Sequence, residues 1–273
     1  MADVVKELET VTSVDGTEIG YWKAGEGPPL VMVHSSIADH TRWDALLAHL
    51  VPSVTVHAMD RRGRGASGDS PEYAIEREYE DVAAVVDSVA ATADSPVAVY
   101  AHSYGGLCAF GAATLTANVE KLMLYEGWPP VDPTPFAPDP GFLEQVETLL
   151  EEGARDRATE TVLRVAAGMS DEEIEAYRAE PSWDARVDAI HTYPREELAF
   201  AETPFDERDA RAIDVPTLLL TGSESPDIWQ VETVAAALQN ARIAVLSGQG
   251  HGADVVAPEL VAEKLLGFLD VAG

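Results

Sequence analysis

The stretch that most constrains this chain runs from Val97 to Leu107 and reads VAVYAHSYGGL. Its first part is an apolar, β-branched run typical of a buried strand, and an alanine-rich pattern of helical spacing follows the turn. Ala101 and Gly105 are small residues placed two before and two after Ser103, which lets the backbone pass from strand to helix in one strained step. The stretch therefore predicts a nucleophile elbow carrying Ser103, with Ala101 where glycine is more usual.

The length and composition of the chain predict one sizeable α/β domain with an insertion. The chain has 273 residues, of which 46% are hydrophobic, so it can bury a large core. It contains no run of about 18 apolar residues that could cross a membrane. The residues after Met1 are polar and acidic, unlike a secretory signal, and Cys108 is the one cysteine. We therefore expect no disulfide, no membrane association and a cytoplasmic location.

The charge balance excludes one class of partner and indicates a source. The chain has 18 basic and 48 acidic residues, a formal net charge of −30, with the acids spread along its length. Such a charge repels phosphate backbones, so we expect no nucleic-acid partner. A hydrated acidic surface whose self-repulsion is screened by concentrated salt predicts a halophilic, salt-accumulating source.

Hydrophobic patterning divides the chain into a core and an insertion. After an N-terminal hairpin signal, strand patterns alternate with helical patterns up to Tyr125 and again from Val215 to Leu269, which predicts a parallel sheet covered on both faces. Between these parts a proline-rich entry leads into helical patterns without a strand candidate. We expect a core made of residues 1–127 and 214–273, with residues 128–213 as a helical lid.

A serine hydroxyl needs a neighbouring base to act as a nucleophile, and His251 is the best candidate. It lies in the glycine-rich sequence SGQGHGA after the last strand pattern, on a loop that can reach a serine at the end of a central strand. No histidine pair has the H-E-x-x-H spacing and Cys108 stands alone, so no metal site is predicted.

Two carboxylates compete to orient His251. Asp227 follows a strand pattern, but Ser225 and Pro226 before it form an ordinary helix start, where the helix dipole accounts for an acid. Glu126 closes the apolar strand that follows the elbow helix and has no comparable structural explanation. We favour Glu126, with Asp227 as the alternative acid.

One further motif has the form of a dinucleotide-binding fingerprint. Gly63, Gly65 and Gly68 follow a strand pattern with G-x-G-x-x-G spacing. No helix opens there, since the next residues are Asp69-Ser70-Pro71, and the following strand does not end in the acid expected to bind a ribose. We therefore predict no cofactor and interpret the segment as a structural loop.

Taken together, these residues resemble the α/β-hydrolase family. The order Ser103, acid, His251 is the family's order, and the residues DRRGRGAS starting at Asp60 resemble the D-x-R-G-x-G-x-S loop of its esterase, haloperoxidase-like and C–C-bond hydrolase branches. The resemblance implies an eight-stranded, mostly parallel sheet with helices on both faces and a lid after the sixth strand. It also implies oxyanion-hole donors from the backbone N–H of Tyr104 and of Ser36, or alternatively Ser35, which follow His34 where the family usually has His-Gly.

The function expected from these features is a serine hydrolase that cleaves a small or medium, largely apolar ester by acyl transfer to water. The alternatives are a C–C bond hydrolase or a perhydrolase with the same triad, or a lid-bearing sensor of a small molecule with little turnover. In each case the partner is a small molecule, and the sequence does not specify an oligomeric state.

Overall fold

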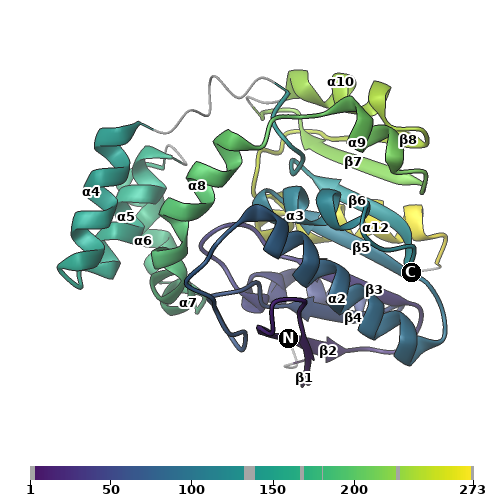
Figure 1. Cartoon of the computed structure of the whole chain (residues 1–273). Coiled ribbons are helices and arrows are strands. Elements are labelled where there is room, and N and C mark those ends of the chain that lie inside the picture. Colours follow the sequence, from purple (N-terminus) through teal and green to yellow (C-terminus); the bar gives the residue numbers. More distant parts are fainter. Residues whose placement is uncertain (1–3, 132–138, 167–168, 180, 226–227, 272–273) are drawn as a thin grey trace.

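The computed structural model describes residues 4–131, 139–166, 169–179, 181–225 and 228–271. Within them an eight-stranded sheet has the order β1-β2-β4-β3-β5-β6-β7-β8 (Figure 1). The strands are β1 (Glu7–Thr12), β2 (Glu18–Ala24), β3 (Pro29–Val33), β4 (Thr55–Met59), β5 (Val97–His102), β6 (Val119–Tyr125), β7 (Thr217–Gly222) and β8 (Ala241–Leu246). The pairs β1–β2 and β2–β4 are antiparallel and all the others are parallel, as the patterning predicts.

Helices cover both faces of the sheet. One face packs against α2 (Ile75–Ala93), α3 (Tyr104–Ala112), α9 (Glu207–Ala212) and α10 (Val231–Ala237). The other packs against α1 (Asp44–Leu50), which continues the 3-10 helix η1 (His40–Trp43), and against α11 (Ala253–Val256) and α12 (Pro258–Leu269). Because both faces are covered, every residue of β5 and of β7 is buried, which explains their unbroken apolar runs.

Local boundaries differ from the predicted ones near the end of the chain. The helix whose start is expected at Ser225 and Pro226 begins, in its described part, as the 3-10 helix η4 (Ile228–Gln230). It continues as α10, which ends where Leu238 turns extended. The short helix α11 was not expected and follows directly on the loop of His251. Such end effects depend on packing more than on periodicity.

The sheet has a topological switch point beside the elbow. β3 lies between β4 and β5, so the chain leaves β3 toward one side of the sheet and later returns to its other side. At such a point the loops that follow neighbouring parallel strands diverge and leave a crevice at the carboxyl ends of the strands. The loops after β3 and β5, which carry Ser36 and Ser103, follow the two strands on either side of this switch point.

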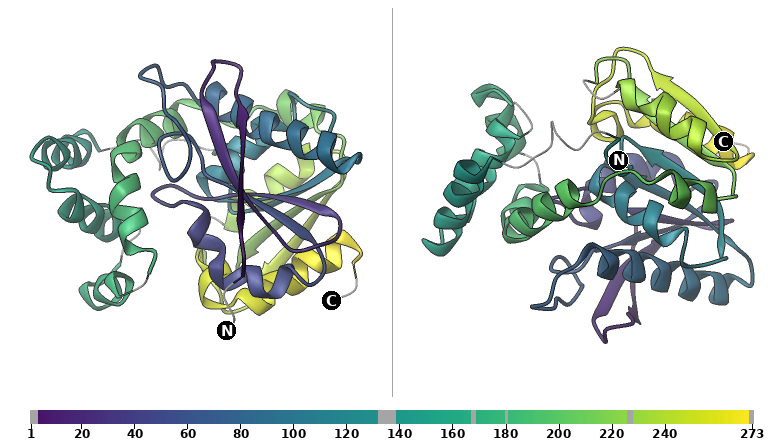
Figure 2. Two further views of the ribbon diagram at one scale, coloured as in Figure 1. Left: turned by 90° about the horizontal axis from the view of Figure 1, so that it is seen from below. Right: turned by 45° about the horizontal axis from the view of Figure 1, so that its top comes forward.

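A set of helices lies between β6 and β7. We call α4–α8 the helical insertion: α4 (Pro140–Glu151), α5 (Arg155–Val165), α6 (Asp171–Arg178), α7 (Trp183–Ala189), η3 (Ile190–Thr192) and α8 (Tyr193–Glu202). Its described residues contain no strand, and Figures 1 and 2 show it beside the sheet, with α8 running back toward the core. It has its own apolar cluster, which includes Val146, Val162 and Trp183 and is joined by Ile37 from the loop after β3. No helix in the described ranges is both long and apolar enough to cross a membrane.

Candidate active site

Ser103 occupies the strained turn that the sequence predicts. Its φ of 54° and ψ of −129° lie outside the regions usual for a non-glycine residue, between the end of β5 and the start of α3. Ala101 is completely buried in β5, so the core accommodates its methyl group where glycine is more usual. Strain at one residue of this turn indicates a functional position rather than a packing need.

Three glycines allow other parts of the backbone to approach this turn. A Cβ on Gly105 would lie 2.3 Å from the carbonyl oxygen of His34, and one on Gly106 would lie 2.4 Å from the carbonyl oxygen of Gly127. A Cβ on Gly127 would in turn lie 2.4 Å from the carbonyl oxygen of Ser103. The glycine pair after the serine therefore brings together the loops that follow β3, β5 and β6.

His251 and Glu126 meet across the carboxyl ends of β6 and β8. The Nδ1–H of His251 donates to Oε2 of Glu126 at 2.6 Å, while Oε1 accepts from the backbone N–H of Gly222 at 2.7 Å and from the hydroxyl of Thr221 at 3.1 Å. A carboxylate only accepts, so this bond fixes a proton on Nδ1, and in the neutral tautomer Nε2 is then the acceptor. The His251 side chain is 54% exposed and that of Glu126 only 4%.

The environment of Glu126 favours its charged form. Burial by itself would raise the pKa of this carboxyl, but the hydrogen bond and charge of His251, with the bonds from Gly222 and Thr221, lower the pKa below its usual value. Glu126 also has a positive φ of 44°, uncommon for a residue with a long side chain. An ionised, fully bonded and backbone-strained acid beside a histidine has the properties of a triad acid.

The loop of His251 is held in place by Tyr125 and His102, two residues for which the sequence analysis predicted no such role. The hydroxyl of Tyr125 donates to the carbonyl oxygen of Gly250 and accepts from the N–H of Ala253 at 3.2 Å. Nε2–H of His102 donates to the carbonyl oxygen of His251 at 2.7 Å, and the two imidazole rings lie 4.6 Å apart. Burial lowers the pKa of His102 well below its ordinary value, so this ring is neutral. His102 and Tyr125 end the neighbouring strands β5 and β6. This position at the strand ends is the sequence signal for their role, and it can be interpreted only once the strands are placed in the sheet.

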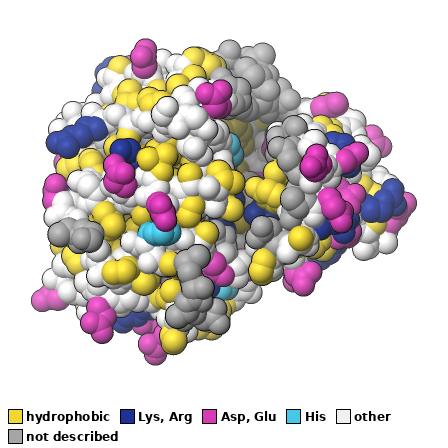
Figure 3. Space-filling view, turned by 180° about the vertical axis from the view of Figure 1, so that it is seen from behind, with side chains coloured by type: hydrophobic (Ala, Val, Ile, Leu, Met, Phe, Trp, Pro, Cys, Tyr) yellow, Lys and Arg dark blue, Asp and Glu magenta, His cyan; other side chains and the backbone are white. Residues whose placement is uncertain are grey.

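The proposed oxyanion-hole residues lie next to the turn of Ser103. The loop after β3 lies against the first turn of α3, because Gly105 abuts His34, so Ser35 and Ser36 lie near the backbone of Tyr104. Asp227, the alternative acid, lies outside the described residues. Ser103 itself is half-buried, and among the described residues its hydroxyl has no hydrogen-bond partner. Figure 3 shows the surface hollowed between the sheet-bearing body and the smaller helical lobe.

The glycine-rich loop after β4 is organised around a buried carboxylate. Asp60 accepts hydrogen bonds from the N–H and Nδ1 of His40, both at 2.8 Å, from the indole of Trp22 at 3.0 Å and from the N–H of Ala66 at 2.9 Å. A Cβ on Gly65 would lie only 2.2 Å from this carboxyl group. The next helix, α2, begins at Ile75, so the glycines do not lead directly into a helix N-terminus as a pyrophosphate site requires.

Asp39, His40 and Asp60 form the one group of side chains in the described part of the chain that could approach a metal ion. Both oxygens of Asp60 are already used by the four bonds above, and one oxygen of Asp39 accepts from the N–H and hydroxyl of Thr41. These hydrogen bonds explain the cluster without an ion, so we treat it as structural.

A serine on a strained strand-to-helix turn, at the switch point of a mostly parallel sheet and near a histidine–carboxylate pair from later strands, defines the class of hydrolases built on an α/β sheet. Comparison with known proteins agrees, because a model of the alpha/beta hydrolase family matches residues 30–264. The chain belongs to the α/β hydrolase family.

Individual relatives cover nearly the whole chain. A non-heme haloperoxidase of Rhodococcus erythropolis is 31% identical over 95% of this chain and 98% of its own length. An (E)-2-((N-methylformamido)methylene)succinate hydrolase of Acinetobacter baylyi is 25% identical over 92% of this chain and 93% of its own length. The crystal structure of an α/β hydrolase from Sphaerobacter thermophilus superposes with a TM-score of 0.81 at 31% identity, covering 96% of this chain and 100% of that one.

Proposed function

We propose that the protein is a serine hydrolase in which Ser103, His251 and Glu126 form the catalytic triad. The observation that carries this proposal is the 2.6 Å hydrogen bond between His251 and Glu126, at the strand ends where Ser103 occupies its strained turn. The bond orients an exposed imidazole so that, in its neutral tautomer, the far nitrogen is the one that can accept a proton.

In the proposed mechanism the Ser103 hydroxyl attacks a substrate carbonyl and Nε2 of His251 takes its proton. Glu126 keeps the imidazole in the required tautomer and stabilises its positive charge. The imidazolium returns the proton to the departing alcohol, leaving an acyl-serine. Water, deprotonated by the same nitrogen, attacks this ester, and the serine oxygen leaves with the proton held by His251, which releases the acid.

The developing oxyanion needs donors that are already in place. The backbone N–H groups of Tyr104, at the start of α3, and of Ser36 or Ser35, in the adjacent loop, are the proposed donors. A donor of this kind contributes about 3 kcal/mol to transition-state stabilisation in comparable sites. The helical insertion is proposed to act as the lid. Phe200 of α8, whose ring centre lies 6.5 Å from that of Tyr104, brings an apolar side chain to this part of the core and favours a small or medium, largely apolar ester.

A panel of p-nitrophenyl acyl esters of increasing chain length, assayed in high salt, tests this proposal. We expect turnover that depends on chain length, and a decrease in kcat/KM of at least about 10³-fold in Ser103→Ala, since the nucleophile of a triad is lost. A Ser103→Ala variant that keeps full turnover would refute the assignment. Ester turnover that is negligible in the wild type, with Ser103 unreactive toward a fluorophosphonate, would refute it as well.

The haloperoxidase relative supports one second candidate, perhydrolysis at the same triad. There hydrogen peroxide replaces water as the acceptor, so the acyl-serine yields a peracid and free serine. Bromination of a chromogenic acceptor in acetate buffer with hydrogen peroxide and bromide measures the peracid. This candidate predicts bromination that disappears in Ser103→Ala, and bromination that persists in the variant contradicts it.

A further inference from the structure

The loop that carries the proposed oxyanion donor has a backbone conformation that it would not adopt by itself. Ile37, directly after Ser36, has a φ of 43°, in the left-handed region where a β-branched residue is strained. A strained residue persists only when surrounding contacts determine its conformation. The question is which contacts hold this loop.

The first contact is apolar and comes from the helical insertion. Ile37 is 6% exposed and belongs to the buried cluster formed by insertion residues such as Val146, Trp183 and Tyr193. Removing such an apolar side chain from water is favourable and offsets the strain at its φ. The loop and the insertion therefore share one apolar core, although Ile37 belongs to the sheet-bearing part of the chain.

The second contact is ionic and also reaches from the insertion. Glu196 on α8 is 1% exposed and accepts from Nη2 of Arg61 at 2.8 Å and from Nη2 of Arg64. Burial by itself would raise the pKa of Glu196, but the charges of the two arginines, with hydrogen bonding by Arg64 and by the side chain of Ser36, lower it. Glu196 is therefore an anion at neutral pH, and it faces the residue whose N–H is the proposed donor.

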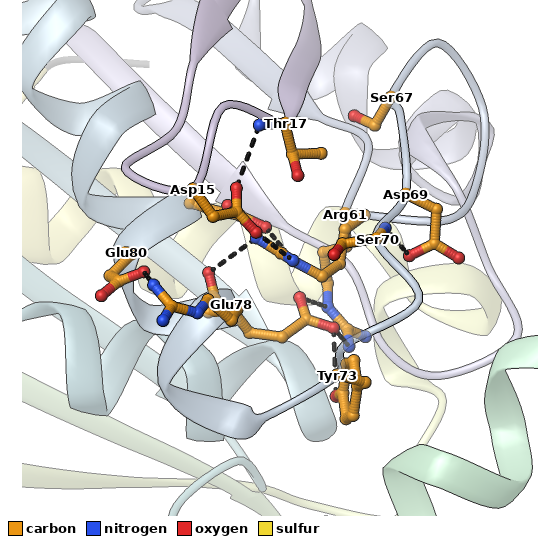
Figure 4. Close-up of polar contacts among 12 residues, drawn as sticks. Asp15, Thr17, Arg61, Ser67, Asp69, Ser70, Tyr73, Glu78 and Glu80 are labelled. Carbon is orange, nitrogen blue, oxygen red and sulfur yellow. Dashed lines mark hydrogen bonds and ion pairs between the residues drawn. The ribbon is translucent and has the colours of Figure 1, made fainter.

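Arg61 links Glu196 to the backbone of the loop that follows β3. Its Nη1 lies 3.4 Å from the carbonyl oxygen of Ser35, and its own N–H donates to Nε2 of His34 at 3.1 Å. Its guanidinium also lies 4.6 Å from the ring centre of Tyr104 and is held from the other side by Glu78. Figure 4 shows this side chain against the carboxylate of Glu78, with the hydroxyl of Tyr73 at the same carboxylate.

We infer that Glu196 of the helical insertion is a positioning residue that holds the loop of Ser36 through Arg61 and the Ser36 side chain, so that the insertion sets the geometry of the oxyanion hole. The inference rests on the proposed hydrolase function. In this arrangement the insertion does more than cover the site, because two of its contacts act on the one loop that must keep a backbone N–H aimed at the reacting oxygen.

The test compares Glu196→Gln with Glu197→Gln. Both variants lose one carboxylate from adjacent positions of α8, but Glu197 is paired with Tyr193 inside the insertion rather than with the oxyanion loop. We measure kcat and KM for p-nitrophenyl acetate, the second-order rate of fluorophosphonate labelling, and the unfolding midpoint. A misaligned donor costs less than a deleted one, for which about 10²–10³-fold is typical. We therefore expect kcat and the labelling rate of Glu196→Gln to fall about tenfold or more with KM within about twofold, and Glu197→Gln to stay within about twofold throughout.

A second variant keeps the inference testable if Glu196→Gln does not fold. Ser36→Ala removes the hydroxyl and keeps the backbone N–H, so it should lower kcat by about threefold or more at unchanged KM. A purely structural role for Glu196 predicts a lower unfolding midpoint with kcat and labelling rate unchanged, and that result, or a change confined to KM, overturns the inference. Full activity of Ser103→Ala would instead refute the hydrolase function itself, so the two failures are distinguishable.

Discussion

The phenol of Tyr125 offers the sharpest test of how the base is held. It bridges the carbonyl oxygen of Gly250 and the N–H of Ala253, on either side of His251. Tyr125→Phe removes one oxygen atom and preserves the shape of a completely buried ring. Tyr100 supplies a matched control, because it is also completely buried, one strand away, and its hydroxyl has no partner among the described residues.

The size of the effect follows from what the substitution leaves unpaired. Ala253 is completely buried, so its N–H would lose its partner without access to water, at a cost of about 1–3 kcal/mol. Gly250 is half-buried and can regain a water, so its lost bond costs about 1 kcal/mol. The sum of about 2–4 kcal/mol corresponds to a decrease of about 4–8 °C in the unfolding midpoint for a chain of this size. If about 1.4 kcal/mol of it acts on the placement of His251, kcat falls about tenfold.

Ester turnover and thermal unfolding, measured on both variants, check this reasoning. Tyr125→Phe should lower kcat and the midpoint together, whereas Tyr100→Phe should leave kcat unchanged and leave stability equal or higher, since it removes an unsatisfied buried hydroxyl. If the two variants behave alike, the bridge across the His251 loop has no role in placing the base, and our account of the loop is wrong.

Three further predictions concern charge. Glu126→Gln should lower kcat about 10³–10⁴-fold and Asp227→Asn less than about threefold, and the reverse ranking would make Asp227 the triad acid. The folded-state pKa of Glu126 is lowered, so its ionised form adds stability at pH values above the unfolded pKa of about 4.3. This stability is lost as the pH falls through the folded pKa. Between about pH 6 and pH 3 the unfolding free energy should therefore fall less steeply in Glu126→Gln than in the wild type. With a net charge of −30, the midpoint should fall by at least about 5 °C between 1 M and 0.01 M salt, as the Debye length grows from about 3 Å to about 30 Å; an unchanged midpoint would contradict a salt-dependent surface.

Local patterning was sufficient to predict most of the fold. The strand pattern that reaches Tyr125 in the sequence is β6 in the structure and ends at that residue, and the apolar run from Val97 ends at the strained serine, which small residues flank. Alternation of strands and helices was enough to predict a mostly parallel sheet with both faces covered. These predictions succeed because they depend on residues that are neighbours in the chain.

The site was predictable only in part. Glu126 was selected as an acid that ends a strand without a structural reason, and His251 as a histidine in a glycine-rich loop after the last strand pattern. The structure places Nδ1 of His251 2.6 Å from Oε2 of Glu126, although the two residues are 125 positions apart in the sequence. The roles of Tyr125 and His102 could not be predicted. A tyrosine or histidine at the end of a strand can be an ordinary core residue or can bind a distant loop, and the sequence pattern is the same in both cases. Their partners lie on the loop after β8 and are known only once β5, β6 and β8 are placed in the sheet.

The sequence by itself determined the order of strands and helices, the turn at Ser103 and the acidic surface, because each depends on residue types at short spacing. Only the tertiary structure decided which acid meets His251, which hydroxyl holds its loop, and that Glu196 and Ile37 connect the helical insertion to the loop of Ser36. The physical reason is that a hydrogen bond or an apolar contact acts over a few ångströms in space, whatever the distance along the chain.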